Sequence, residues 1–201
     1  MSLSARLAVL VVLATAVLAG ALYSLDRIRA PRYPDLGFAP AFTLADSRGD
    51  SLGVADLRGK VWAVDFMFTR CRGICPILAR RMLSLQDALA EESGWALVSI
   101  SVDPEHDRPD TLAAYADRIG AGNNWHFLTG EKDYIFGVVE KGFLLPVKEQ
   151  PGNEKEPVLH SGRIMLVDRD GRFRGIYDSS DDEDMEALEK QAVQLIRQGA
   201  S

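Results

Sequence analysis

The sequence predicts an α/β domain in which strands alternate with helices and an antiparallel hairpin follows near the C-terminus. Two apolar runs rich in strand-forming residues, 61–68 and 96–102, predict buried strands. Each precedes a segment with apolar residues at helical spacing, 76–92 and 109–119. Strands that alternate with helices in this way are typical of an α/β sandwich.

The first half of the domain is predicted to contain a hairpin and two helices. Residues 42–44 and 51–54 flank a Ser-Arg-Gly-Asp turn, which predicts an N-terminal hairpin. Pro76 suits the first position of the helix over 76–92, because proline lacks the N–H that would be unpaired there. The apolar face of that helix consists of Leu78, Met82, Leu85 and Leu89, and that of the next helix consists of Leu112, Tyr115 and Ile119.

The second half of the chain continues the pattern. Residues 125–128 predict a short strand and residues 134–142 a short helix. Two further apolar runs, 164–167 and 173–177, flank Arg169-Asp170-Gly171, a strong hairpin signal. A last helix follows, with one apolar face formed by Met185, Leu188, Ala192 and Leu195.

The composition excludes several classes of protein. The chain has 201 residues and a net charge of −6, with 47% hydrophobic and 26% charged residues, which are ordinary globular values. Collagen-like, disordered and wholly membrane-embedded chains are therefore excluded. Removing residues 1–30 makes the net charge of the remainder −8, which is unfavourable for binding nucleic acid. A domain of about 160 residues can bury a sufficient core without disulfides.

The N-terminus predicts a membrane anchor. After a short tail, residues 1–6, no charged residue occurs over 7–25. As a helix this segment would span roughly 28 Å, close to the thickness of a hydrocarbon core, so we interpret it as a single transmembrane helix. A cleaved signal peptide is the alternative, since Ala19-Gly20-Ala21 resembles a cleavage site.

Residues 26–40 contain three prolines, Pro31, Pro34 and Pro40, and predict a stiff tether between the anchor and a globular domain over 41–201. The orientation is ambiguous. Arginines just after the span favour a cytoplasmic domain, but long domains translocate largely regardless of nearby charge.

The functional site is expected at the junction of a strand and a helix, in the run Thr69-Arg70-Cys71-Arg72-Gly73-Ile74-Cys75-Pro76. Cys75 lies beside the helix N-terminus and Cys71 one turn before it, so the two sulfurs can converge. Backbone N–H groups there, with Arg70 and Arg72, favour the thiolate. Two such thiolates can close a small disulfide or bind a soft metal such as Cu(I). The spacing also allows inert buried thiols or a passive disulfide.

A third metal ligand would come from three histidines. His106 lies in a polar loop and His126 in a short strand, where solvated and structural roles respectively are expected. His160 is the favoured candidate for the third ligand, because the loop before the terminal hairpin can return to the start of the first helix. Met67 and Met165 lie in apolar strands and are interpreted as core residues. The acidic run 181–184 is expected to stabilise the N-terminus of the last helix through the helix dipole, or to form a solvated face.

Several short motifs occur in a fixed order over roughly residues 42–177. These are Gly59-Lys60-Val61-Trp62, the run from Asp65 to Pro76, Ser101-Val102-Asp103-Pro104 with Arg108-Pro109-Asp110-Thr111-Leu112, His160-Ser161, Leu166-Val167-Asp168 and Asp170-Gly171. In these motifs and their order the chain resembles the SCO/SenC family of copper chaperones. One departure is visible, because Leu159 precedes His160 where the family often has an aspartate.

The resemblance implies a thioredoxin-like fold, a membrane tether and copper, Cu(I) or Cu(II), bound by Cys71, Cys75 and His160. It also implies help in assembling the copper site of cytochrome c oxidase subunit II, or of another copper-site apoprotein, with copper received from a donor protein. The domain would then be extracytoplasmic, on the periplasmic side of a bacterial inner membrane.

Two other classes of function stay open. The alternative is a thiol–disulfide oxidoreductase that cycles a Cys71–Cys75 disulfide, although that reaction has no need of His160. A peroxiredoxin-like peroxidase is disfavoured because the chain has no distant resolving cysteine. An inert membrane-tethered module would show neither copper binding nor redox activity.

Overall fold

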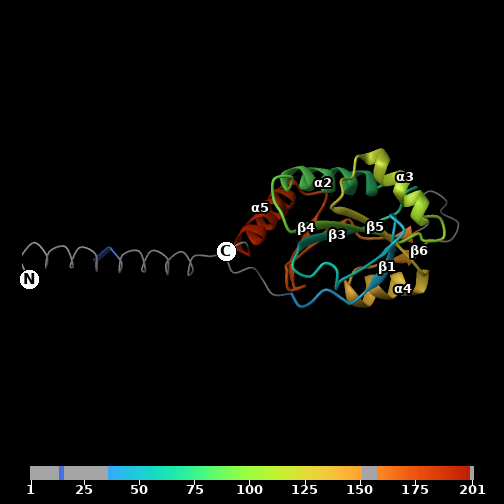
Figure 1. The fold of residues 1–201 in the computed structure, drawn as a ribbon. Helices are drawn as coiled ribbons and strands as arrows, with labels where there is room; N and C mark the ends of the chain where they lie inside the picture. The colour runs from blue at the N-terminus through green and yellow to red at the C-terminus, as the bar shows by residue number, and fades with distance from the viewer. Residues whose placement is uncertain (1–13, 16–35, 151–157, 200–201) are drawn as a thin grey trace, which may run out of the picture. The chain divides into compact units, whose positions relative to one another are not determined.

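The computed structural model describes residues 14–15, 36–150 and 158–199, and the chain divides into two units, Met1–Tyr33 and Pro34–Ser201. The described part of the second unit contains a seven-stranded sheet with the order β2-β1-β5-β4-β3-β8-β9 (Figure 1). Its strands are β1 (Thr43–Asp46), β2 (Ser51–Gly53), β3 (Val61–Met67), β4 (Trp95–Ser101), β5 (Trp125–Thr129), β8 (Arg163–Val167) and β9 (Phe173–Asp178).

The centre of the sheet is parallel and both edges are antiparallel. β3, β4 and β5 run in the same direction, and they are connected by α2 (Cys75–Ala88) and α3 (Pro109–Ile119). The β1–β2 hairpin lies at one edge and the β8–β9 hairpin at the other. The mixed α/β fold and both predicted hairpins are therefore confirmed.

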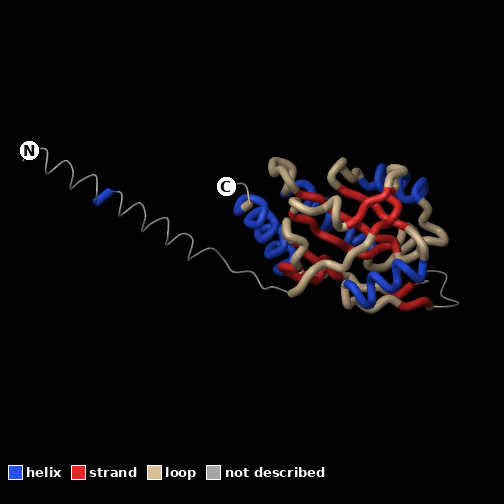
Figure 2. Tube along the Cα trace, turned by 60° about the horizontal axis from the view of Figure 1, so that its bottom comes forward, coloured by secondary structure: helices blue, strands red, loops and turns tan. Residues whose placement is uncertain are grey.

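Helices cover both faces of this sheet. Figure 1 shows α2 and α3 on one face and α4 (Lys132–Gly137) on the other, and Figure 2 shows the strands between them. The last helix, α5 (Asp182–Gln198), contacts α2, β3 and β9. Burial on both faces explains why β3 and β4 are nearly continuous apolar runs instead of alternating ones.

Side chains of β3 alternate between the two layers. Asp65 and Met67 line a small void shared with α2, whereas the ring of Phe66 meets that of Phe143 at 5.0 Å on the opposite face. Met67 and Met165 are buried in the core, as predicted. The strand thus ends with one face directed at the helix that begins with Cys75.

The segment after β5 is more elaborate than the single helix predicted over 134–142. α4 is followed directly by a π-helical turn, η1 (Val138–Gly142). A second small sheet then pairs β6 (Lys148–Glu149) with β7 (Val158–Leu159). These strands have two residues each, which is too short for a hydrophobic period to be recognised in the sequence.

The buried face of α5 differs from the prediction at its last position. Met185, Leu188 and Ala192 are buried as expected, but Ile196 takes the place expected for Leu195. An α-helix has 3.6 residues per turn, so three turns after Met185 the same face is reached again about eleven positions later, at Ile196.

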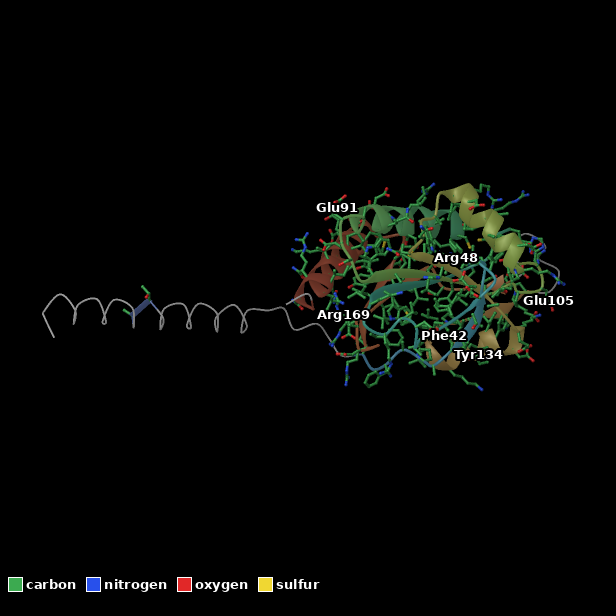
Figure 3. All side chains as sticks on the ribbon, in the orientation of Figure 1. Phe42, Arg48, Glu91, Glu105, Tyr134 and Arg169 are labelled. Carbon is green, nitrogen blue, oxygen red and sulfur yellow. The ribbon has the colours of Figure 1, made fainter. Side chains whose placement is uncertain are left out.

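Both ends of α5 are fixed by hydrogen bonds. The Asp181 carboxylate accepts from the backbone N–H groups of Glu183 and the next residue, so the acidic run lies at the N-terminus of this helix, as predicted, and also caps it. The Arg169 guanidinium, labelled in Figure 3, donates to the carbonyl oxygens of Ile196 (2.9 Å) and Gly59 (2.8 Å). The C-terminal end of α5 is thereby tied to the segment that leads into β3.

The last part of the proline-containing segment is attached to the domain. The Ala39 N–H donates to the carbonyl of Gly171 (2.8 Å), the Phe173 N–H donates to the carbonyl of Gly37 (2.8 Å), and the Phe38 ring lies against the Arg172 guanidinium at 4.2 Å. Residues 36–40 therefore run along the β8–β9 hairpin.

The predicted anchor over 7–25 lies outside the described residues except for Ala14 and Thr15, which are helical. Among the residues that the structure describes, none of the helices combines the length and apolar character that a membrane crossing requires.

Candidate metal centre

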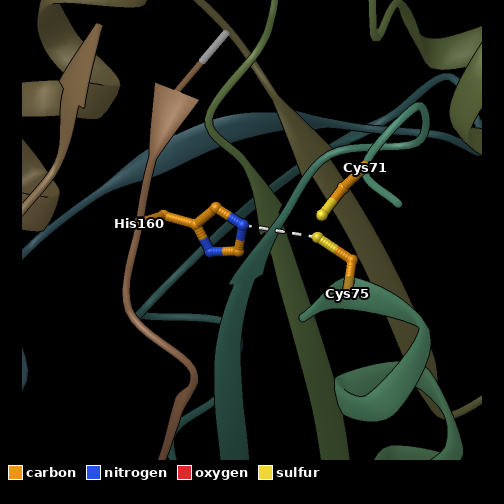
Figure 4. Close-up of side chains that lie close together, drawn as sticks. All are labelled: Cys71, Cys75 and His160. Atoms are coloured by element: carbon orange, nitrogen blue, oxygen red, sulfur yellow. Dashed lines mark hydrogen bonds between the residues drawn. The ribbon is translucent and has the colours of Figure 1, made fainter. Parts of the chain in front are cut away.

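Two cysteines and one histidine converge at one end of the central strands (Figure 4). Cys71 lies in the loop after β3, Cys75 is the first residue of α2, and His160 follows β7 directly. One ligand atom from each residue lies within 4.8 Å of the other two. The His160 Nε2 atom is 3.4 Å from the Cys75 Sγ atom. The fold therefore brings together the three residues singled out in the sequence.

The start of α2 places both sulfurs. Cys75 is buried, Cys71 is partly exposed, and both are free thiols in this structure. Pro76 occupies the first helical turn and no side chain caps the helix. Backbone N–H groups of Gly73 and Cys75 are instead directed at the Cys71 sulfur. This is the favourable environment for a thiolate that a helix N-terminus supplies.

The two cysteines differ strongly in acidity. The hydrogen bond from the Cys75 thiol is the largest influence on Cys71 and, despite partial burial, lowers the pKa of Cys71 to about 4. His160 and the backbone N–H groups act in the same direction. The pKa of Cys75 is raised, first by its hydrogen bond to Cys71 and then by burial. The apo site at neutral pH thus holds one thiolate and one thiol.

The two ring nitrogens of His160 have different surroundings. Nδ1 lies 3.2 Å from the carbonyl oxygen of Ser161, and the ring stands edge-on to Phe68 at 5.4 Å. A carbonyl oxygen only accepts, so Nδ1 carries the proton that it donates there. When this is the proton that the ring keeps, Nε2 faces the sulfurs with its lone pair, and this is the tautomer that binds a metal through Nε2.

A buried carboxylate lies behind the cysteines. Asp65, which is 2% exposed, lines the same small void as Cys75. Its Oδ1 atom accepts from the Ser99 hydroxyl at 2.5 Å, and that hydroxyl in turn accepts from the Trp125 indole N–H at 2.9 Å. Burial raises the pKa of Asp65 to about 6, although the Ser99 hydrogen bond and the charge of His160 oppose the increase.

The other histidines stay outside the centre, as expected. His106 is exposed in the loop after β4. His126 lies on β5 with its Nδ1 atom 2.6 Å from the Oδ2 atom of Asp46 on β1. That pair joins two neighbouring strands of the sheet and has a structural role.

The arginines beside Cys71 play a different part from the one expected. Arg70 donates from Nε to the Asp103 carboxylate at 2.7 Å, so its charge is paired, while Arg72 is exposed. The acidity of Cys71 depends instead on Cys75, His160 and the backbone.

Sequence reasoning assigned no role to Asp65 or Asp107. A signal was present for Asp65, because a lone acid inside the apolar run 61–68 must be buried if the run forms a central strand. Asp107 lies in an ordinary polar loop sequence, and its complete burial follows only from the tertiary structure.

The donor set defines the chemistry of the centre. Two sulfurs and one imidazole nitrogen form a soft to borderline set, suited to Cu(I) through thiolate and to Cu(II) through imidazole. Acidic oxygens, which hard cations prefer, are not among the three converging ligand atoms. Fold and centre together define a metal-binding protein of the thioredoxin-like α/β class.

Comparisons with known proteins agree with this class. The profile of the SCO1/SenC family matches residues 32–195, so the chain belongs to the SCO1/SenC family. A SCO1 protein homolog of Bacillus subtilis (strain 168) is 37% identical over 134 residues, which cover 65% of this chain and 68% of the relative.

Two solved structures share the fold. Bradyrhizobium japonicum ScoI with copper bound is 26% identical with a TM-score of 0.66, and the match covers 78% of this chain and 99% of that one. BsSco, described as a member of the Sco family of cytochrome c oxidase assembly proteins with a disulfide switch, is 32% identical with a TM-score of 0.69. That match covers 82% of this chain and 98% of BsSco. The prediction of copper is thus confirmed at the level of the family.

Proposed function

We propose that this chain is a copper metallochaperone that delivers copper to, or matures, the copper site of cytochrome c oxidase subunit II. The observation that carries the proposal is the convergence of ligand atoms from Cys71, Cys75 and His160 within 4.8 Å. Membership of the SCO1/SenC family and the copper-bound structure of a relative support the same function.

The geometry suits a protein that holds copper as cargo. Three ligands from this chain leave room for one from a partner, so a recipient can bind the ion before the donor releases it. Cys71 is partly exposed whereas Cys75 is buried, and the site can therefore be approached from the Cys71 side. Since a mixed sulfur and nitrogen set accommodates both Cu(I) and Cu(II), transfer in either oxidation state is compatible with the residues present.

A second candidate function is thiol–disulfide exchange through a Cys71–Cys75 disulfide. It is favoured by the low pKa of Cys71, which keeps a nucleophilic thiolate available at neutral pH beside a protonated Cys75. The chaperone is preferred because it also explains why the imidazole of His160 faces the sulfurs.

The location forms part of the same proposal. Residues 7–25 would anchor the chain in a bacterial inner membrane, and the domain would lie on the periplasmic side, where an extracytoplasmic copper site is assembled. A related structure is described as a SCO1/SenC family lipoprotein from Bacillus anthracis str. Ames, which supports attachment to a membrane for that relative.

Copper titration of the full-length chain, purified in detergent and followed by elemental analysis, tests the proposal. The reduced protein is expected to bind one copper per chain, and the oxidised protein none. Reduced protein that holds no copper but exchanges its disulfide with glutathione would transfer the assignment to the oxidoreductase.

A further inference from the structure

The loop between β4 and α3 contains a carboxylate that is completely buried. Asp107, which is 0% exposed, accepts three hydrogen bonds. The donors are the Thr69 N–H at 2.9 Å, the Thr69 hydroxyl at 2.5 Å and the Ser101 hydroxyl at 2.7 Å. A carboxylate removed from water is tolerated only when such donors replace its hydration. Two of the three come from a residue 38 positions earlier in the chain.

Those two donors belong to the segment that carries Cys71. Both donors of Thr69, its N–H and its hydroxyl, are bound to Asp107, and the next residue, Arg70, donates to the carboxylate of Asp103 at 2.7 Å. Consecutive residues just before Cys71 are therefore held by two carboxylates of one loop.

The loop that holds them is itself well fixed. The Asp107 N–H donates to the Asp103 carbonyl at 2.9 Å, and the Asp103 N–H donates to the Ser101 hydroxyl at 3.1 Å. At its start, the Val102 N–H donates to the carbonyl of Met67, the last residue of β3, at 2.9 Å. The two carboxylates thus extend from a support joined to the strand that precedes Cys71.

Cys71 needs such a support more than the other two ligands do. Cys75 is held by the first turn of α2, and His160 follows a residue that is paired in β7. Cys71 lies between β3 and α2, where neither a helix nor a strand fixes the backbone. Its own N–H makes one bond, to the Phe68 carbonyl at 3.2 Å.

We propose that Asp107 is a positioning residue for the metal centre, which sets the place of the Cys71 sulfur by holding Thr69. The inference rests on the proposed copper function and adds to it a residue that is not one of the three converging ligands. Without this carboxylate the loop over 69–71 loses the two hydrogen bonds that hold Thr69, and the sulfur spends less time where Cys75 and His160 can share an ion with it.

The test compares Asp107→Asn with Asp46→Asn in the full-length chain purified in detergent. Each change replaces a buried carboxylate with an amide of the same size. The partners of Asp46 are Ser47, Arg48 and His126, none of which belongs to the cysteine loop, so this variant is a matched control for loss of stability alone. The measurements are Cu(I) affinity by competition with a chelator, the sulfur-to-Cu(II) absorption, and thermal unfolding of the apo protein.

Asp107→Asn is expected to weaken Cu(I) binding about tenfold, as loss of groups that orient metal ligands does, and to alter the absorption. Asp46→Asn is expected to lower the unfolding temperature while leaving affinity and absorption unchanged. Folded Asp107→Asn protein with the wild-type affinity and spectrum would overturn the proposal. Equal changes in both variants would overturn it too, because the effect would then be one of general stability.

Variants of Thr69 keep the test decisive if Asp107→Asn fails to fold. Thr69→Val removes the hydroxyl that donates at 2.5 Å and preserves the shape, whereas Thr69→Ser retains the hydroxyl. The valine variant should change copper affinity and absorption in the same direction as Asp107→Asn does. The serine variant should keep the wild-type affinity and absorption. A valine variant identical to wild type in both readouts would contradict the proposal.

A readout without copper separates this proposal from the function on which it rests. In equilibrium with glutathione, Cys71 and Cys75 lose two electrons to form a disulfide, and oxidised glutathione gains them to give two thiols. Asp107→Asn should lower this equilibrium constant by a factor comparable to the loss in copper affinity. Failure of the wild-type chain to bind copper would refute the proposed function, whereas an unchanged equilibrium constant in the variant would refute the positioning role.

Discussion

The Nε2 atom of His160 lies 3.4 Å from the Sγ atom of Cys75, although 85 positions separate the two residues in the chain. The contact exists because the β6–β7 sheet returns the chain to the start of α2. It turns a pair of cysteines, which alone could close a disulfide or bind Cu(I), into a three-donor set that suits both Cu(I) and Cu(II).

The first prediction concerns the ligand set. Cys71→Ser and Cys75→Ser should each abolish the sulfur-to-Cu(II) absorption, and His160→Ala should weaken Cu(I) binding about tenfold or more while the fold persists. Titration followed by elemental analysis measures both effects. His106→Ala and His126→Ala are controls and should keep one copper per chain. Unchanged copper affinity in the His160 variant would exclude the three-ligand site.

The second prediction concerns the competition between copper and the disulfide. Copper requires both sulfurs as thiolates, so oxidation to the Cys71–Cys75 disulfide should abolish tight binding, and reduction should restore it. Thiol counting after mild oxidation should find no free thiols in the copper-free chain and two protected thiols in the loaded chain. Two thiols that persist in copper-free protein under oxidant would mean that the sulfurs do not meet.

The third prediction concerns the pH dependence of Cys71. Because its pKa is lowered to about 4, the thiolate persists as the pH falls and is lost only near that value. Alkylation of Cys71 by iodoacetamide, followed by mass spectrometry, should therefore proceed at a nearly constant rate from pH 8 to pH 5. Cys75→Ala removes the hydrogen bond that lowers this pKa most and should shift the decline to higher pH. A wild-type rate that already falls between pH 9 and pH 7 would disagree with the structure.

The fourth prediction concerns Asp65 and the free energy of unfolding. Its pKa in the folded state, about 6, lies above the ordinary value of 3.8, so the folded state binds this proton more tightly than the unfolded state does. The stabilisation is therefore complete below pH 3.8 and is lost as the pH rises through 6. The difference between the two pKa values corresponds to about 3 kcal/mol.

Denaturant unfolding of wild type and Asp65→Asn between pH 3.5 and pH 7.5 measures this effect, and the wild-type stability should fall relative to that of the variant as the pH rises. Asp46 provides the opposite control. Burial raises the pKa of Asp46, but hydrogen bonds from His126 and Arg48 outweigh burial and leave the pKa below its ordinary value. Its contribution should therefore be lost as the pH falls. Parallel pH profiles for wild type and Asp65→Asn would contradict the prediction.

The fifth prediction concerns membrane topology. A membrane-impermeant thiol reagent should label reduced Cys71 and Cys75 in cells whose outer membrane is permeabilised and whose inner membrane is intact, because the domain is proposed to be periplasmic. The full-length chain should also stay with the membrane fraction at high salt. Labelling that requires lysis of the inner membrane would place the domain on the cytoplasmic side, and release of a chain that begins near Leu22 would indicate a cleaved signal.

Much of the fold could be predicted from local patterns. The buried strands, α2, α3, α5 and both hairpins follow from hydrophobic periods and turn residues, which act over a few positions of the chain. The β6–β7 pair escaped prediction because two-residue strands have no period. On α5 the predicted face was wrong only at its last position, where Ile196 is buried in place of Leu195, because both residues are apolar and a helical face repeats after either three or four residues.

The sequence by itself determined that the chain is an α/β domain, and it was enough to select Cys71 and Cys75 as the candidate thiolate pair and His160 as the candidate third ligand. These features are encoded by residue type and short spacing. Only the tertiary structure decided that Cys75 is the thiol and Cys71 the thiolate, that Arg70 pairs with Asp103, and that Asp107 holds Thr69. The physical reason is that acidity and burial depend on which groups meet across the fold, and contacts between residues dozens of positions apart have no local signature in the chain.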